Sequence, residues 1–101
     1  AQGTLVCLRR TAPAAVPGIN FLSGGQNETT ATANLHALNA TTEKQPWVLS
    51  FSYGRALQAS VLQAWRGEVA NKSIAQQALS KRARLNSAAT QGQYTAAMEN
   101  E

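Results

Sequence analysis

Two short segments of the sequence combine residue types that bind anions. The first, Ser23 to Gly25, offers backbone N–H groups that no side chain shields, together with a hydroxyl. The second, Ser52 to Arg55, adds another hydroxyl, an unshielded N–H at Gly54 and a guanidinium that can hold phosphate through paired hydrogen bonds. Either segment alone is typical of an ordinary turn. Together they predict a phosphate site made by Gly24, Gly54 and Arg55, with Ser23 nearby.

Each of these segments directly follows a predicted strand. Gly18 to Leu22 and Trp47 to Phe51 are short apolar runs bounded by Pro, Gly or Ser, which is typical of buried strands. In α/β folds, ligands bind at the C-terminal ends of the strands. We therefore expect that the two strands are neighbours and that they bring the two segments together.

A helical period follows each of the two turns. The first helix has Thr29 or Thr30 as its expected cap and ends near Asn39. The second runs from Ala56 to Arg66 and is ended by Gly67, and its expected apolar stripe consists of Leu57, Val61, Leu62 and Trp65.

Two further helices flank these units. Residues Thr4 to Thr11 have the pattern of a helix that ends before Pro13. A last helix runs from an Asn71 cap to about Ala89, with an apolar face made by Ile74, Ala78, Leu79 and Leu85. Residues 92–101 show no periodicity, and we expect them to form a flexible tail.

Strands that alternate with helices predict an α/β fold with a parallel sheet. The chain of 101 residues is expected to be a single segment, yet two strands are too few for a parallel sheet with both faces covered. Alanine, with 19 residues, is as common as Val, Ile, Leu and Phe together, so the buried apolar area is small. These observations indicate two βα units that belong to a larger fold.

Residues that could perform catalysis are scarce, and we assign none. Lys44 lies in a loop, and Lys72 and Lys81 lie on outer helices, so no lysine ends a strand as a desolvated nucleophile would. His36 is interpreted as a packing residue of a helix. With one His, one Cys and no Asp, no metal site is predicted, and no cofactor is expected.

Three other side chains have structural interpretations. Trp47 and Trp65 are expected to pack in the core and between helices, and Glu28 to supply negative charge at a helix N-terminus. Tyr53 has two open interpretations, because it could face a ligand or pack at the end of its strand.

The charge and the cysteine content bear on partners and location. Nine Lys and Arg against five Glu give a net charge of +4, which favours anionic partners. The basic clusters Arg9-Arg10 and Lys81 to Arg84 lack aromatic neighbours, so they are interpreted as solvated helix faces and not as a nucleic-acid surface. No apolar run reaches the ~18 residues of a membrane span. The single Cys7 favours a reducing compartment, so we expect a cytoplasmic chain with neither nucleic acid nor membrane as a partner.

Three stretches of the sequence resemble the C-terminal part of class I fructose-1,6-bisphosphate aldolase. They are Leu8 to Gly18, Phe21 to Gln26 (Phe-Leu-Ser-Gly-Gly-Gln) and Pro46 to Ser60, which contains Phe-Ser-Tyr-Gly-Arg-Ala-Leu-Gln. The resemblance extends from about Thr4 to Thr95 without a gap between the two loops. It implies the C-terminal portion of a (β/α)8 TIM barrel, in which the two predicted strands are strands 7 and 8.

The resemblance also implies an activity and a set of binding residues. Members of the family cleave fructose 1,6-bisphosphate reversibly to dihydroxyacetone phosphate and glyceraldehyde 3-phosphate through a lysine imine, without a metal. They are cytosolic homotetramers. The positions that match a substrate phosphate site, its lining or its immediate neighbour are Ser23, Gly24, Gly25, Ser52, Tyr53, Gly54 and Arg55.

Departures from the family pattern limit what this segment is expected to do. The imine-forming lysine and the acid/base carboxylates match positions upstream of Ala1, and the family's tyrosine-ending tail has no counterpart after Thr95. Asn27 to Thr30 replaces a more acidic stretch. We therefore expect an inactive phosphate-binding segment of a class I aldolase; the alternative is a non-catalytic structural or interaction protein derived from such a segment.

Overall fold

Two parallel strands form the sheet of the computed structural model, which describes residues 1–101. Strand β1 is Gly18–Leu22 and strand β2 is Val48–Ser52, in a register that places Gly18 opposite Val48 and Leu22 opposite Ser52. The prediction of β1 is confirmed. Strand β2 lies one residue further along the chain than Trp47 to Phe51, so Ser52 ends a strand and does not begin a turn. The chain is thus α/β with a small parallel sheet.

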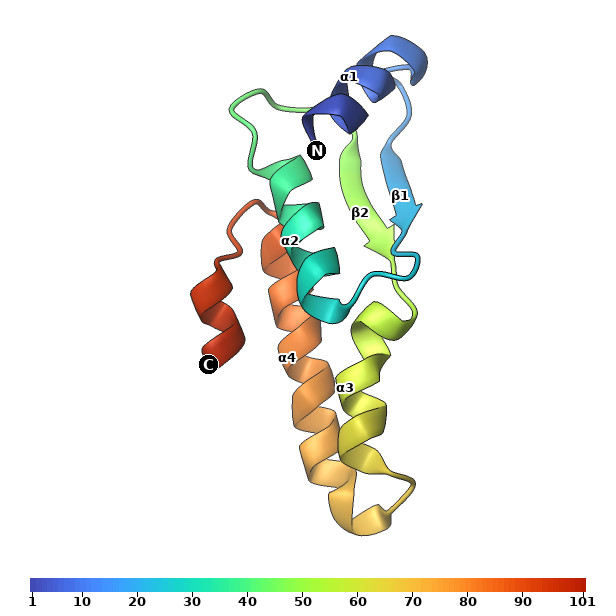
Figure 1. Cartoon of the computed structure of the whole chain (residues 1–101). Helices are drawn as coiled ribbons and strands as arrows, with labels where there is room; N and C mark the ends of the chain where they lie inside the picture. Colours follow the sequence, from blue (N-terminus) through green and yellow to red (C-terminus); the bar gives the residue numbers. More distant parts are fainter.

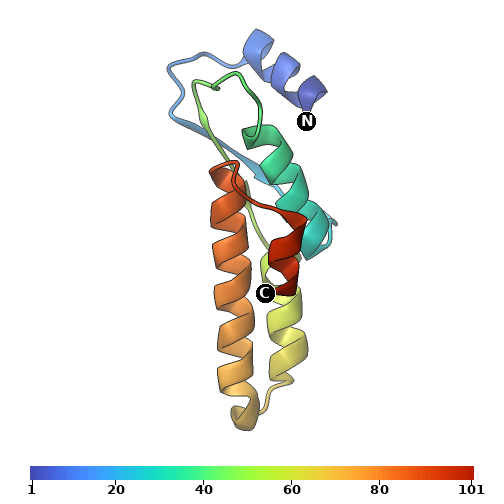
Figure 2. The same cartoon turned by 90° about the vertical axis from the view of Figure 1, so that its left-hand side faces the viewer.

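Helical segments make up most of the remaining structure (Figure 1). They are α1 (Gln2–Thr11), α2 (Glu28–Asn39), α3 (Arg55–Trp65), the 3-10 helix η1 (Val69–Asn71), α4 (Lys72–Thr90) and the 3-10 helix η2 (Ala96–Asn100). Helix α1 lies across the N-terminal end of the strands, whereas α3 and α4 form a long antiparallel pair beyond the C-terminal end. In Figure 2, α2 and α4 lie in front of the sheet, so they cover one of its faces.

The core lies between this face of the sheet and the helices. One buried cluster consists of Leu5, Leu38, Trp47 and Leu49, and partly buried Ile19, Phe21 and Phe51 pack against it. A second cluster consists of Leu35, Leu85, Ala89 and Tyr94. The indole N–H of Trp47 donates to the Pro13 carbonyl at 2.8 Å, so this buried side chain also fixes the connection between α1 and β1. The predicted core role of Trp47 is confirmed.

The ends of two helices differ from the prediction. Helix α2 is capped by Asn27, whose Oδ1 accepts from the Thr30 N–H at 2.8 Å, and not by a threonine. An asparagine side chain two or three residues before the threonines satisfies a free N–H group in the same way, and the helix therefore starts at Glu28. Helix α4 starts after Asn71 as predicted, but the Asn71 side chain donates to the Trp65 carbonyl at 3.1 Å and does not cap the helix.

The predicted apolar faces of α3 and α4 are largely wrong. Leu85 is buried, but Ile74 and Leu79 of α4, and Leu62 and Trp65 of α3, are exposed. The face of α4 that contacts α2 is instead formed by Arg82, Leu85, Asn86 and Ala89. This face combines the apolar Leu85 and Ala89 with the polar Arg82 and Asn86, whereas Trp65 and Leu79 line an open cavity between α3 and α4.

The basic run on α4 is also not uniformly solvated. Arg84 is exposed, as predicted for the whole run, but Arg82 is buried and paired with Glu99 at 2.6 Å. Glu99 belongs to η2, a helix that the absence of periodicity did not predict. Tyr94, which precedes η2, is buried in the second core cluster. The expected flexibility of residues 92–101 stays a prediction. In the structure, Tyr94 and Glu99 of this segment contact α4.

Candidate functional site

The two glycine-containing loops lie side by side at the C-terminal edge of the sheet. The Ser23 N–H donates to the Ser52 carbonyl at 3.2 Å, which continues the strand pairing one step beyond β1. Parallel pairing in register places both strand ends at the same edge, so the loops leave the sheet together. The two segments therefore lie next to each other, as the sequence predicted.

Three glycine N–H groups at this edge have no acceptor within the chain. The backbone N–H groups of Gly24, Gly25 and Gly54 donate no hydrogen bond to another residue. Gly24 has a φ of 61°, a left-handed conformation that glycine adopts without strain. Gly54 is the N-cap of α3, and its carbonyl accepts from the N–H groups of Leu57 and Gln58 at 3.0 and 3.2 Å. The site therefore offers unpaired donors at a helix N-terminus, an arrangement that suits an anion.

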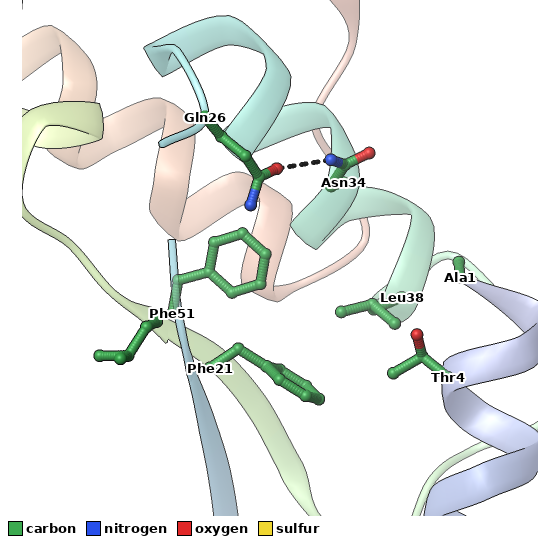
Figure 3. A pocket seen from close by; sticks show the side chains of 8 residues that line it. Ala1, Thr4, Phe21, Gln26, Asn34, Leu38 and Phe51 are labelled. Atoms are coloured by element: carbon green, nitrogen blue, oxygen red, sulfur yellow. Dashed lines mark hydrogen bonds between the residues drawn. The ribbon is translucent and has the colours of Figure 1, made fainter. Parts of the chain in front are cut away.

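Gln26 shapes the first loop, a role that was not predicted from the sequence. Its Nε2 donates to the Ser23 carbonyl at 2.8 Å, and its Oε1 accepts from the Asn34 side chain of α2. Figure 3 shows this pair above a cavity of about 310 Å³, between Phe21, Phe51 and the start of α1. Gln26 thus closes the loop onto the second turn of α2. Its place directly after Ser-Gly-Gly was the only signal in the sequence.

Arg55 and Gly25 line one open cavity between the starts of α2 and α3. This cavity has a volume of about 620 Å³, and Glu28 and Ser60 form part of its wall. The Arg55 side chain is exposed and has no partner within the chain, so its guanidinium is free to bind an anion. Glu28 accepts from the Ser60 N–H at 2.7 Å and from the Ser60 hydroxyl, and thereby joins the two helices. Its predicted place in the first turn of a helix is confirmed.

The remaining predicted site residues lie at different depths. Ser23 is 3% exposed, so its hydroxyl is covered in this structure, whereas Ser52 is exposed at the end of β2. Tyr53 packs against Phe51 with ring centroids 5.9 Å apart, and its hydroxyl is buried without a partner. Burial raises the pKa of Tyr53 to about 12, and the charge of Arg82 lowers it slightly against that effect. Of its two open interpretations, Tyr53 adopts the packing one.

The other titratable groups do not form a reactive centre. His36 is half-buried and meets the Tyr94 ring at 5.9 Å, which agrees with its interpretation as a packing residue. Lys44 and Lys72 are exposed, and Lys81 donates to the Glu99 backbone carbonyl. No group of three or more His, Cys, Asp or Glu side chains lies close enough to hold a metal ion. None of the helices is both long enough and apolar enough to cross a membrane.

Comparison with known proteins shows the family to which this chain belongs. The model of the family described as "Fructose-bisphosphate aldolase class-I" matches residues 1–101. The chain belongs to the class I fructose-bisphosphate aldolase family. The resemblance inferred from the two loop motifs is thus confirmed.

Individual aldolases agree with this assignment. The chain is 60% identical over 94 residues to fructose-bisphosphate aldolase B of Mus musculus, covering 93% of this chain and 26% of that protein. It is 57% identical over 97 residues to the non-muscle aldolase of Lethenteron camtschaticum, covering 96% of this chain and 27% of that one. The chain therefore spans about a quarter of the length of the aldolases that it matches.

A solved aldolase shares the fold of this segment. The structure of fructose-bisphosphate aldolase from Plasmodium falciparum, in complex with TRAP and a small-molecule inhibitor, superposes with a TM-score of 0.87 at 53% identity. The superposition covers 91% of this chain and 26% of that one. The strands and helices of this chain are thus arranged like the matching quarter of that solved aldolase.

Proposed function

We propose that this chain is the phosphate-binding segment of a class I aldolase that reversibly cleaves fructose 1,6-bisphosphate to dihydroxyacetone phosphate and glyceraldehyde 3-phosphate. The observation that carries the proposal is the pairing of the two loops at one sheet edge, where glycine N–H groups and the Arg55 guanidinium are unpaired. Backbone donors and a guanidinium are the groups that hold phosphate. The proposed binding residues are Ser23, Gly24, Gly25, Ser52, Gly54 and Arg55, and Tyr53 packs against Phe51 as their immediate neighbour.

The bare face of the sheet supports a barrel in which β1 and β2 are strands 7 and 8. Gly18, Asn20 and Leu22 alternate with the residues that face the helices, and so do Val48 and Ser50 of β2. Leu22 is 81% exposed and Val48 63% exposed. Parallel sheets are covered on both faces, and the interior of a (β/α)8 barrel is filled by side chains. The bare face fits such an interior.

Within the enzyme, this segment contributes position and not reactive groups. A phosphate held by Gly24, Gly54 and Arg55 fixes the distance from the substrate carbonyl to an amine, which is the positioning contribution to catalysis. None of Lys44, Lys72 and Lys81 lies at the C-terminal end of a strand, so we propose that the imine-forming lysine belongs to another part of the barrel. The segment alone is therefore expected to be inactive. We also propose that the complete enzyme is a cytoplasmic homotetramer that needs neither metal nor cofactor.

Dihydroxyacetone phosphate binding tests the proposed site in this chain. We expect the ligand to shift the amide NMR signals of Gly24, Gly25 and Gly54. Arg55→Ala is expected to weaken binding about tenfold or more, because hydrogen bonds to charged groups contribute about 1.5–3 kcal/mol. Arg10→Ala, which removes an equal charge from exposed α1, is the control. Equal affinity of the two variants would contradict the role of Arg55.

Catalysis is tested by borohydride reduction and by a chimaera. With dihydroxyacetone phosphate and borohydride, no covalent adduct is expected on this chain, and an adduct would overturn the assignment of the lysine. In the chimaera, residues 1–101 replace the matching quarter of Mus musculus aldolase B. We expect the chimaera to cleave fructose 1,6-bisphosphate and Arg55→Ala to raise its KM. A folded but inactive chimaera would favour the non-catalytic alternative.

A further inference from the structure

A buried arginine of α4 contacts the first turn of α2, next to the proposed phosphate site. Arg82 is 4% exposed, and its Nη1 donates to Glu99 Oε2 at 2.6 Å. Its Nη2 donates to the Glu28 carbonyl at 3.1 Å and to Thr32 Oγ1. A buried charge is stable only when it is paired and hydrogen-bonded. Glu99 therefore keeps the guanidinium inside the protein, where it reaches α2.

Glu99 is itself held by the docking of the C-terminal segment, residues 94–99. The buried Tyr94 hydroxyl donates to Glu99 Oε1 at 2.9 Å, and the Lys81 ammonium donates to the Glu99 carbonyl. Both carboxylate oxygens of Glu99 are thus engaged, one by Tyr94 and one by Arg82. Undocking of this segment would leave Arg82 buried without its counter-ion.

The contact continues from Arg82 to the helix that begins with Arg55. Glu28 is the first residue of α2, and its carboxylate accepts from the backbone and the hydroxyl of Ser60 on α3. Arg82 fixes the main chain of Glu28, while Ser60 fixes its side chain. Glu28 therefore connects the ion pair to the start of α2 and to the second turn of α3.

Two cavities lie on the two sides of this Glu28–Ser60 contact. Gly25 and Arg55 line the one of about 620 Å³, and Arg82 and Glu99 line another of about 340 Å³. Glu28, Thr29 and Ser60 line both. The contact is therefore the common wall between the candidate site and the buried ion pair.

We propose that Arg82 and Glu99 are positioning residues for the phosphate-binding loops. Docking of residues 94–99 holds Arg82 on the first turn of α2, and this maintains the Glu28–Ser60 contact and the spacing of the two loops. Loss of docking loosens that turn and weakens phosphate binding, although neither residue touches the ligand. The expected loss of phosphate affinity rests on the proposed function. The expected loosening of the first turn of α2 rests only on the contacts of Arg82 and Glu99.

The test compares Glu99→Gln with Glu101→Gln, since both glutamates pair with an arginine of α4 but only the Glu99 pair is buried. Amide hydrogen exchange is measured from Glu28 to Thr32, and the affinities for inorganic phosphate and dihydroxyacetone phosphate are measured by NMR titration. In Glu99→Gln we expect faster exchange and about fivefold weaker binding, the lower end of typical couplings between sites. Glu101→Gln is expected to change neither, and Glu99→Asp to recover part of both.

Each outcome decides the proposal. Unchanged exchange from Glu28 to Thr32 in Glu99→Gln overturns it, even if residues 94–99 become mobile. If Glu99→Gln does not fold, Tyr94→Phe removes only the hydroxyl contact to Glu99, and faster exchange in α2 is again expected; its absence overturns the proposal. If the unaltered chain binds neither ligand, the proposed function fails, whereas the exchange measurement still tests the positioning role.

Discussion

The Tyr53 hydroxyl is a buried polar group without a hydrogen-bond partner next to the candidate site. Burial disfavours its ionised form and raises its pKa from 10.0 to about 12. The folded state thus prefers the protonated hydroxyl. The resulting contribution to stability is fully present below pH 10 and is lost as the pH rises through about 12.

Absorbance of tyrosinate against pH measures this effect directly. The chain has two tyrosines, and burial also raises the pKa of Tyr94, helped by its hydrogen bond to Glu99. In the folded chain we expect both to ionise later than in urea, where both titrate near pH 10. Tyr53→Phe should remove the ionisation near pH 12 and leave that of Tyr94. A Tyr53 ionisation near pH 10 in the folded chain would contradict the buried position of its hydroxyl.

Single residues show how far the sequence could predict the candidate site. The residue types at Gly24, Gly54 and Arg55 were sufficient to indicate an anion site, because their donors belong to the residues themselves. The burial of Arg82 could not be predicted, since it depends on Glu99 and on the Glu28 carbonyl. Arg82 and Arg84 occur in the same basic run, and only the fold distinguishes them.

Two glycines with positive φ that follow helices have different structural requirements. Gly67 follows α3 with a φ of 72°, and a Cβ there would meet no atom within 4 Å. Gly92 follows α4 with a φ of 70°, but a Cβ there would lie 2.7 Å from the Asn39 carbonyl oxygen at the end of α2. Gly67 thus continues the left-handed turn that begins at the C-cap Arg66, while Gly92 also permits close contact between two chain segments.

Alanine at each position separates these two requirements. Gly67→Ala should lower the free energy of unfolding by about 1–2 kcal/mol, the cost of a left-handed conformation for an L-residue. Gly92→Ala should lower it by about 1–3 kcal/mol more, because the main chain near Asn39 must also move. Urea unfolding of both variants provides the measurement. Equal losses would show that the α2 end and the chain after α4 are not in close contact.

The elements themselves were largely predictable because their signals are local. Apolar runs between Pro, Gly and Ser residues predicted both strands, and Gly67 predicted the end of α3. The apolar faces of α3 and α4 were not predictable, because helical spacing shows that Ile74, Leu79 and Trp65 lie along a helix but not which neighbour they meet. These side chains are exposed here, and the packing of α2 with α4 is made by Arg82, Leu85, Asn86 and Ala89 instead.

The exposed apolar surface of the chain is distributed as in part of a larger domain. The sheet has helices on one face only, and large apolar side chains of α3, η1 and α4 remain exposed, including Leu62, Val69 and Ile74. The alanine-rich composition predicted such a thin core. The chain spans about a quarter of the length of its relatives, and the rest of the proposed barrel is the expected cover for the bare face of the sheet.

Substitutions of two neighbouring residues on opposite faces of β2 test whether the bare face is buried in the complete enzyme. Val48 is on the bare face and Leu49, which is 1% exposed, is in the core. In the isolated chain, Val48→Ala should change the free energy of unfolding by less than about 0.5 kcal/mol, whereas in the chimaera with aldolase B it should cost about 1–2 kcal/mol, because the removed methyl groups are buried there. Leu49→Ala should cost about 2–5 kcal/mol in both proteins. If Val48→Ala destabilises the chimaera no more than the chain, the bare face of the sheet is not the interior of the barrel.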